Sequence, residues 1–249
     1  MQGKNMNLFR VKVLSLSALF MGTIILPVMA GLLNAENDDA GLNIIQSVPA
    51  EFPNNALMNG IHSGKVRMVV SVDADGQLVD QLVVAYTNEV FVASAVRAVK
   101  AWTYEPARVR GIPRASRADL IFVFKGDLVV TVQNAEYNFL QSIFGDVYVF
   151  QPSLLRDLDH IPVPVHVVTP SIPDGALAMG EVRVVTVEFY IDQEGRVRVP
   201  SVSREQADDR LAAVAVAAVE QWRFEPPMRK GQPVLVLAQQ DFRFVTKAK

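Results

Sequence analysis

Residues 102–106 read Trp-Thr-Tyr-Glu-Pro, and residues 222–226 read Trp-Arg-Phe-Glu-Pro. The two segments lie 120 residues apart, from Trp102 to Trp222. A period of this length is too long for a solenoid unit, so it indicates two copies of one small domain. The recurrence continues at the same offset, with Gly111-Ile-Pro113 returning as Gly231-Gln-Pro233 and Phe122-Val-Phe124 as Phe242-Arg-Phe244.

Composition places the chain among globular proteins, with 50% hydrophobic and 20% charged residues in a length of 249. Each copy of roughly 80 residues is near the small end of independently folding domains. The net charge of −2 provides no overall field that would attract nucleic acid. The absence of cysteine excludes disulfides, thiol catalysis and cysteine-ligated metals.

The N-terminus has the pattern of an exported protein. Lys4, Arg10 and Lys12 precede an apolar run over residues 13–33, and Val28-Met-Ala30 offers a cleavage site with a small final residue. Residues 1–30 are therefore predicted to be a signal peptide or an N-terminal membrane anchor, because the run is also about long enough to cross a bilayer. Either alternative places the repeats in the periplasm, with possible anchoring to the inner membrane through residues 13–33.

Both copies show the same succession of hydrophobic periods. Alternating apolar residues predict a strand over residues 65–73, and Asp75-Gly76 predicts the turn into a second strand over 77–85. An apolar stripe at helical spacing follows and ends near Pro106, and residues 119–124 alternate again. Copy two repeats this with strands over 182–191 and 196–202, a helix over 211–222 and a strand over 232–245. Either a capping box at 203–206 or Asp208 marks the start of that helix.

A short helix or turn is predicted before each hairpin, near residues 53–59 and 173–179. The order α-β-β-α-β predicts an α+β fold. We expect two tandem two-layer α/β sandwiches, each with a roughly three-stranded antiparallel sheet and helices on one face.

The segment between the copies lacks the composition of a flexible linker. Residues 128–132 predict a strand, and Phe139, Leu140, Ile143 and Phe144 suit one face of a short helix. Residues 127–162 are therefore predicted to be a packed linker, in which residues 128–132 fold back onto the sheet of copy one. The predicted domains are residues 48–126 and 163–246.

The assembled pattern resembles the C-terminal domain of TonB-family energy transducers. The resemblance rests on an acidic-Gly turn, an Ala/Val-rich helix followed by Trp-x-aromatic-x-Pro, a Gly-x-Pro turn and a closing aromatic strand, in that order and twice. Members of this family usually carry an anchor with a Ser and a His, followed by a long Pro-rich stretch. Here the apolar run has no His, and no Pro-rich spacer follows it.

The resemblance implies that an extended peptide of an outer-membrane TonB-dependent receptor adds to the sheet edge as a further strand. The implied partners are such a receptor or another periplasmic protein, and the inner-membrane motor complex if the N-terminus is retained. A soluble periplasmic adaptor without energy transduction remains the alternative. The implied edge is the last strand of each copy, residues 119–124 in copy one and residues 235–244 in copy two. The edge of copy two is the expected partner site, with Leu235, Val236, Leu237, Ala238, Gln239, Gln240, Asp241 and Phe242.

No motif points to an enzyme or to a cofactor. His62, His160 and His166 stand outside any metal-ligand pattern, and neither a nucleophile elbow nor a phosphate loop occurs. We therefore expect neither catalytic residues nor a metal site. The repeated motif residues are predicted to be structural: Trp102, Pro106, Gly111, Trp222, Pro226 and Gly231.

Overall fold

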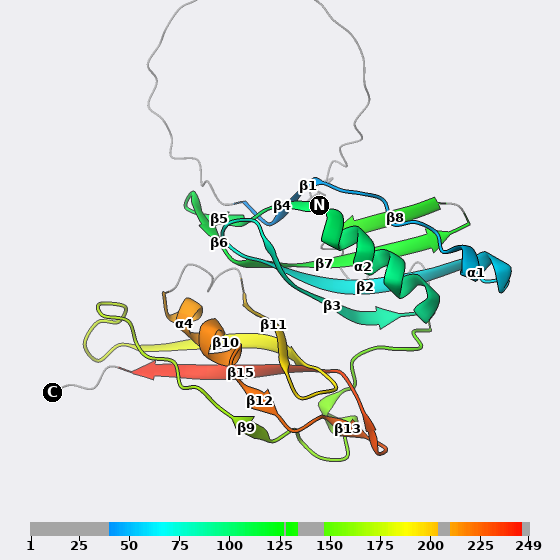
Figure 1. Ribbon diagram of the computed structural model, residues 1–249. Coiled ribbons are helices and arrows are strands. Elements are labelled where there is room, and N and C mark those ends of the chain that lie inside the picture. Colours follow the sequence, from blue (N-terminus) through cyan, green and yellow to red (C-terminus); the bar gives the residue numbers. More distant parts are fainter. Residues whose placement is uncertain (1–39, 127, 134–146, 204–209, 246–249) are drawn as a thin grey trace, which may run out of the picture. The chain divides into compact units, whose positions relative to one another are not determined.

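The computed structural model describes residues 40–126, 128–133, 147–203 and 210–245 (Figure 1). Residues 1–30 and the helix predicted around 139–144 lie outside the described residues, as does the capping box apart from its first residue. In copy one and the segment after it, the elements are β1 (Asn43–Gln46), α1 (Asn54–Met58), β2 (Ser63–Val72), β3 (Leu78–Tyr86), a 3-10 turn η1 (Glu89–Phe91), α2 (Val92–Ala101), β4 (Thr103–Glu105), β5 (Ala107–Val109), β6 (Ile112–Arg114), β7 (Ser116–Lys125), β8 (Leu128–Gln133) and η2 (Leu155–Asp157). Copy two comprises β9 (Pro164–His166), β10 (Val182–Ile191), β11 (Val197–Val202), α4 (Arg210–Val219), β12 (Arg223–Phe224), β13 (Met228–Arg229), β14 (Gln232–Pro233) and β15 (Val236–Val245).

Copy one is built on a four-stranded antiparallel sheet in the order β3-β2-β7-β8. Helix α2 covers one face of this sheet (Figure 1), and its buried side chains include Ala95 and Val99. The facing residues of β2 are Val66, Met68 and Val70, all fully buried. The period-2 pattern of β2 and the helical stripe of α2 thus meet in one core.

Copy two repeats this arrangement with three strands in the order β11-β10-β15. Helix α4 lies on one face of the sheet (Figure 1), where Leu211 and Ala215 pack against Val187 and Phe189 of β10. The predicted α+β fold, with an antiparallel sheet and helices on one face in each copy, is confirmed.

An indole hydrogen bond ties the end of each helix to the segment that leads into the same copy. Trp102 Nε1 donates to the carbonyl of Val48 at 2.7 Å, and Trp222 Nε1 donates to that of Val168 at 2.8 Å. Donor and acceptor are 54 residues apart in both copies. Because each indole is 93% buried, its N–H would be costly to leave without an acceptor. The strand after each Trp then pairs with the leading segment, β4 with β1 and β12 with β9.

In each copy the hairpin turn is closed by an aspartate at the corresponding position. Asp73 Oδ1 accepts from the backbone N–H of Asp75 and Gln77 at 2.9 and 2.8 Å. Asp192 Oδ1 accepts from the N–H of Glu194 and Arg196 at 3.0 and 2.9 Å. These aspartates therefore hold turns, as Asx motifs do, rather than ligating a cation.

A glycine in each of these turns contacts the segment after the Trp. Gly195 has a φ of +77°, and a Cβ placed on it would lie 2.0 Å from the carbonyl oxygen of Phe224. Gly76 has a φ of +82°, and its Cβ would lie 2.7 Å from that of Tyr104. The turn requires glycine both for its left-handed conformation and for this close approach of two backbones.

The Gly-x-Pro motifs form tight two-residue turns. Arg110 and Gly111 have φ values of +52° and +75°, and Lys230 and Gly231 have values of +51° and +71°. Two successive positive φ values are those of a type I′ turn, which suits the twist of the short hairpins β5-β6 and β13-β14.

Two details differ from the sequence prediction, and the alternatives left open at residues 173–179 are resolved. Helix α2 ends at Ala101, because Trp102 is already extended with ψ of 156°, so Pro106 separates β4 from β5 instead of ending the helix. Residues 173–179 form turns, one of the two alternatives predicted there. The strand predicted over 232–245 is divided between β14 and β15, because Pro233 cannot donate to a continued ladder.

The helix-free faces of the two sheets share a small apolar cluster. Val69, Leu82 and Val84 of copy one pack there with copy-two residues, among them Tyr190 and Val199. Ion pairs accompany this cluster. Arg198 Nε donates to Asp80 Oδ2 at 2.9 Å, and Arg117 Nη2 donates to Glu188 Oε1 at 2.6 Å. The two copies are therefore joined by packed side chains as well as by the chain itself.

We expect Gly195→Ala to lower the free energy of unfolding by about 3 kcal/mol or more, because the left-handed conformation and the overlap with Phe224 both oppose a side chain. Gly231→Ala is the matched control, since its φ is similar but nothing lies within 4 Å of the added Cβ. That control should cost about 1–2 kcal/mol. Urea unfolding of both variants measures the difference. Equal costs would show that the approach to Phe224 is not restrictive.

A second prediction concerns the contribution of the Asp192 carboxyl group to stability. Burial raises its pKa, but hydrogen bonds from the Arg196 N–H, the Arg196 guanidinium and the Glu194 N–H outweigh burial, so the pKa lies below the ordinary 3.8. A lowered pKa stabilises the fold fully above the ordinary value, and this stabilisation is lost as the pH falls below it. Asp192→Asn should therefore reduce the urea midpoint at pH 7, with a difference from the wild type that shrinks at pH 3. An unchanged difference across that range would contradict the ionic role of Asp192.

Candidate functional site

The open margin of the copy-two sheet is formed by β15. This strand pairs with β10 along its whole length, from Val182↔Val245 to Ile191↔Val236. On its other side, no described strand forms a ladder with it. Near its start the described chain approaches it from outside the sheet, where the Ser153 N–H donates to the Leu235 carbonyl at 2.8 Å. Most of β15 therefore presents backbone groups that a further strand can pair with.

The sequence-predicted edge residues are placed unevenly along this margin. Leu235 precedes β15, is 98% buried and already has its carbonyl bonded to Ser153, so the edge begins one residue later than predicted. Val236 lies in the strand but is fully buried. The other six all lie in β15: Leu237, Ala238, Gln239, Gln240, Asp241 and Phe242.

The side chains of β15 alternate between two environments. Phe242 and Phe244 face the core below α4, whereas Gln239 and Asp241 are exposed on the opposite face. Asp241 accepts a hydrogen bond from Thr186 Oγ1 at 2.7 Å, which fixes β15 to β10. β15 is thus fixed to β10 along one edge, and the backbone groups of its other edge remain available for pairing.

A groove of about 400 Å³ lies next to the C-terminal half of β15. One wall is the leading segment of copy two, with Val168 and Ile172, and the other is the end of β15, with Phe242 and Phe244. Trp222 also contributes to the lining. This apolar groove can receive a side chain of a strand that lies on β15. The groove was not predicted from the sequence. The recurrence of Val48 as Val168, at the repeat offset of 120, is the one sequence signal for its wall.

The corresponding margin of copy one is covered. Strand β8 pairs with β7 over the register Lys125↔Leu128 to Leu120↔Gln133. The expectation that residues 128–132 fold back onto this sheet is confirmed. The predicted edge of copy one, residues 119–124, is therefore an interior strand.

The other outer strand of copy two carries the features that natural proteins use to protect an edge. Strand β11 contains Pro200, which lacks a backbone N–H. Val199 beside it has a φ of +42°, and the register of β10 against β11 is irregular between Glu188 and Tyr190. Such irregularity disfavours an added strand. By contrast, β15 contains no proline and keeps an unbroken register.

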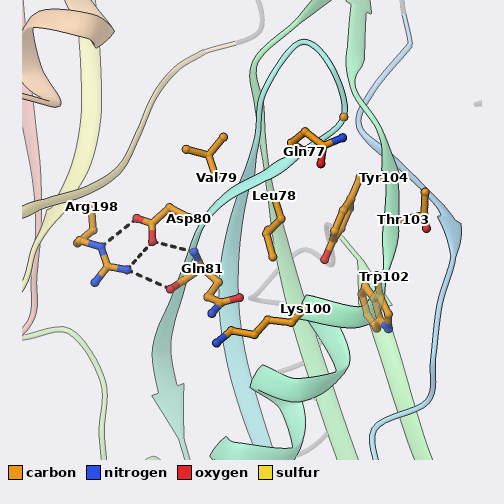
Figure 2. Close-up of a pocket in the computed structure, with 11 residues that line it drawn as sticks. Gln77, Leu78, Val79, Asp80, Gln81, Lys100, Trp102, Thr103, Tyr104 and Arg198 are labelled. Carbon is orange, nitrogen blue, oxygen red and sulfur yellow. Dashed lines mark hydrogen bonds and ion pairs between the residues drawn. The ribbon is translucent and has the colours of Figure 1, made fainter.

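A second hollow, of about 570 Å³, lies beside the start of β3 and the end of α2 (Figure 2). Arg198 lies at its rim and donates to Asp80 and to the Gln81 carbonyl, the latter at 3.1 Å. Lys100 extends toward the Gln81 side chain in Figure 2. The Arg198–Asp80 pair contributes to the contact between the copies. It was not predicted from the sequence. The lining of this hollow offers no set of groups suited to catalysis.

Metal chemistry finds no support in the part of the chain that the structure describes. No group of three or more His, Cys, Asp or Glu side chains there is arranged to hold a metal ion. His160 instead lies 3.8 Å from Glu225 at the surface. Within the same described ranges, no helix is long and apolar enough to cross a membrane.

In each copy the repeated motif residues lie at the end of the helix and in the turns that follow it. Trp102 and Trp222 are buried against aromatic residues of their own sheets, with ring centroids 5.6 Å from Phe122 and Phe242, respectively. Pro106 is buried between β4 and β5, whereas Pro226 is exposed between β12 and β13. Gly111 and Gly231 occupy the type I′ turns.

Comparison with known families gives one match, found twice. The family model described as the Gram-negative bacterial TonB protein C-terminal matches residues 48–125 and 169–246, together more than half of the chain. No curated protein matches the sequence. The chain therefore belongs to the TonB C-terminal family, whose domain is non-enzymatic and related to transport, and it carries two tandem copies of that domain.

Proposed function

We propose that this member of the TonB C-terminal family binds an extended peptide of an outer-membrane receptor, which adds as a strand to β15. The binding would take place in the periplasm and serve energy-coupled transport across the outer membrane. The single observation that carries the proposal is the outer side of β15, which forms no ladder with a described strand and lies next to an apolar groove. Backbone hydrogen bonds supply the affinity in this mode, and the groove supplies side-chain selectivity.

Strand addition also suits the transmission of force. A guest strand on β15 runs alongside a ten-residue ladder between β15 and β10. A pull along the guest loads its hydrogen bonds together, in shear. The indole bond of Trp222 and the core below α4 hold β15's sheet to the rest of the copy. The proposal requires neither a catalytic residue nor a cofactor, and we propose that the chain is not an enzyme.

The test uses synthetic peptides that match the N-terminal segments of outer-membrane receptors from the same bacterium. Because the chain has no cysteine, Gln239→Cys in β15 gives a single thiol that can be trapped by a cysteine in the peptide. We expect disulfide trapping at this position. Val79→Cys is the matched control, since it lies on the outer strand β3 and is 65% exposed. Trapping at Val79 alone, or at neither site, would count against the proposal.

N-methylation of the peptide backbone distinguishes strand addition from side-chain docking. Alternate N–H groups of a strand point to opposite sides, so methylation of one set should abolish binding and methylation of the other should leave it nearly unchanged. Equal effects of both sets would indicate another binding mode.

A soluble periplasmic adaptor is the second candidate function. It is favoured by the lack of His in residues 13–33 and by the lack of a Pro-rich spacer between that run and copy one. Mass spectrometry of the N-terminus, on chain isolated from the cell envelope, separates the two functions. We expect residues 13–33 to be retained, as coupling to an inner-membrane motor requires. Cleavage after Ala30 would favour the adaptor.

A further inference from the structure

Strand β8 is an addition to the family's domain. The family match of copy one ends at residue 125, and β8 begins at Leu128. Two residues separate β7 from β8, so the chain supplies copy one with a further strand beyond the matched domain. Among the described strands, none pairs with β15 in the corresponding place.

β8 lies on the edge of copy one that corresponds to the open edge of copy two. At the repeat offset of 120, residues 120–125 of β7 correspond to residues 240–245 of β15. β8 pairs with every one of these β7 residues. The backbone groups that β15 leaves open in copy two are thus occupied within copy one.

The side chains of β8 also fill the space that remains open in copy two. Val129 is paired with Phe124 and packs on the core cluster that contains Trp102 and Phe122. The counterparts of these three aromatic residues line the groove beside β15. Phe122 is fully buried below β8, whereas its counterpart Phe242 is only partly buried. Gln133 completes the contact, since its Nε2 donates to the Leu42 carbonyl at 2.8 Å.

We propose that β8 is a built-in guest strand that blocks the peptide site of copy one, so that the chain binds one peptide until β8 detaches and opens a second site on β7. This inference rests on the proposed strand addition at β15. A strand tethered through a turn of two residues has an effective concentration of millimolar or more, on the order expected for short linkers. An external peptide therefore does not displace it while the hairpin is intact.

β8 is also the strand of this sheet that is most easily released. Leu128 and Val130 are 60% and 44% exposed, so the face away from α2 contributes little apolar burial. Its outer side forms no ladder with another described strand. Elements with few buried contacts open at lower free energy than the core.

The experiment counts the peptides bound to the full-length chain by native mass spectrometry. The probe is a synthetic peptide with the sequence of residues 126–133, of which residues 128–133 pair with β7 in the structure. Val130→Pro/Val132→Pro removes two backbone N–H groups from β8 and releases the strand. The control, Val130→Thr/Val132→Thr, keeps these groups. We expect one bound peptide for the wild type and the control, and two for the proline variant.

Two further variants keep the result interpretable if the prolines disturb folding. Val129→Asp places a carboxylate against the apolar core and should release β8 by a different route. Cysteine at Val123 or at Arg243, corresponding positions in β7 and β15, reports which edge holds a cysteine-bearing probe. Circular dichroism confirms that each variant remains folded.

Each outcome decides a separate point. A single bound peptide for both folded β8 variants, trapped only at position 243, overturns the latent site and leaves the proposed function intact. Two peptides on the wild type overturn the blocking role of β8. No peptide on the wild type but one on the proline variant, trapped at position 123, supports the latent site and contradicts binding at β15. No binding to any variant overturns the inference.

Discussion

The fold depends on one buried hydrogen bond in each copy, from the indole of the repeated tryptophan to a carbonyl of the leading segment. Trp102 and Trp222 each stand where a helix ends and the chain turns back. Their N–H groups reach Val48 and Val168, which precede the first helix or turn of each copy. The bond therefore connects the beginning of each copy to its last third. The leading segment of copy two, fixed in this way, forms one wall of the groove beside β15.

Both copies share this frame, but they differ at the sheet margin. The same aspartate turn, the same glycine contact and the same type I′ hairpin occur in each copy. Among the described strands, β8 covers the last strand of copy one, and none covers that of copy two. The two frames are similar, and the strand that follows the first frame occupies its edge. The difference arises from six strand residues outside the repeated module.

The repeat and the hydrophobic periods could be read from the sequence, and they were sufficient for the architecture. Alternation in β2 and β10 predicts strands with one buried face, and the structure has them with nearly the same bounds. Sequence patterns were less informative where tertiary contacts decide. The sequence left a helix or a turn open near residues 173–179, where the structure has turns, and α2 stops at Ala101 because Trp102 is already extended. The groove could not be predicted, since it depends on residues 70 positions apart that meet only after folding. The same holds for the pairing of Arg198 with Asp80.

The hairpin of β7 and β8 has a mechanical consequence. Gln133, the last residue of β8, lies at the end of the hairpin away from its turn and leads into the segment that continues to copy two. Tension on the chain beyond Gln133 would load the bonds between β8 and β7 one after another rather than together. We therefore expect β8 to detach from β7 before the strands inside the sheet separate.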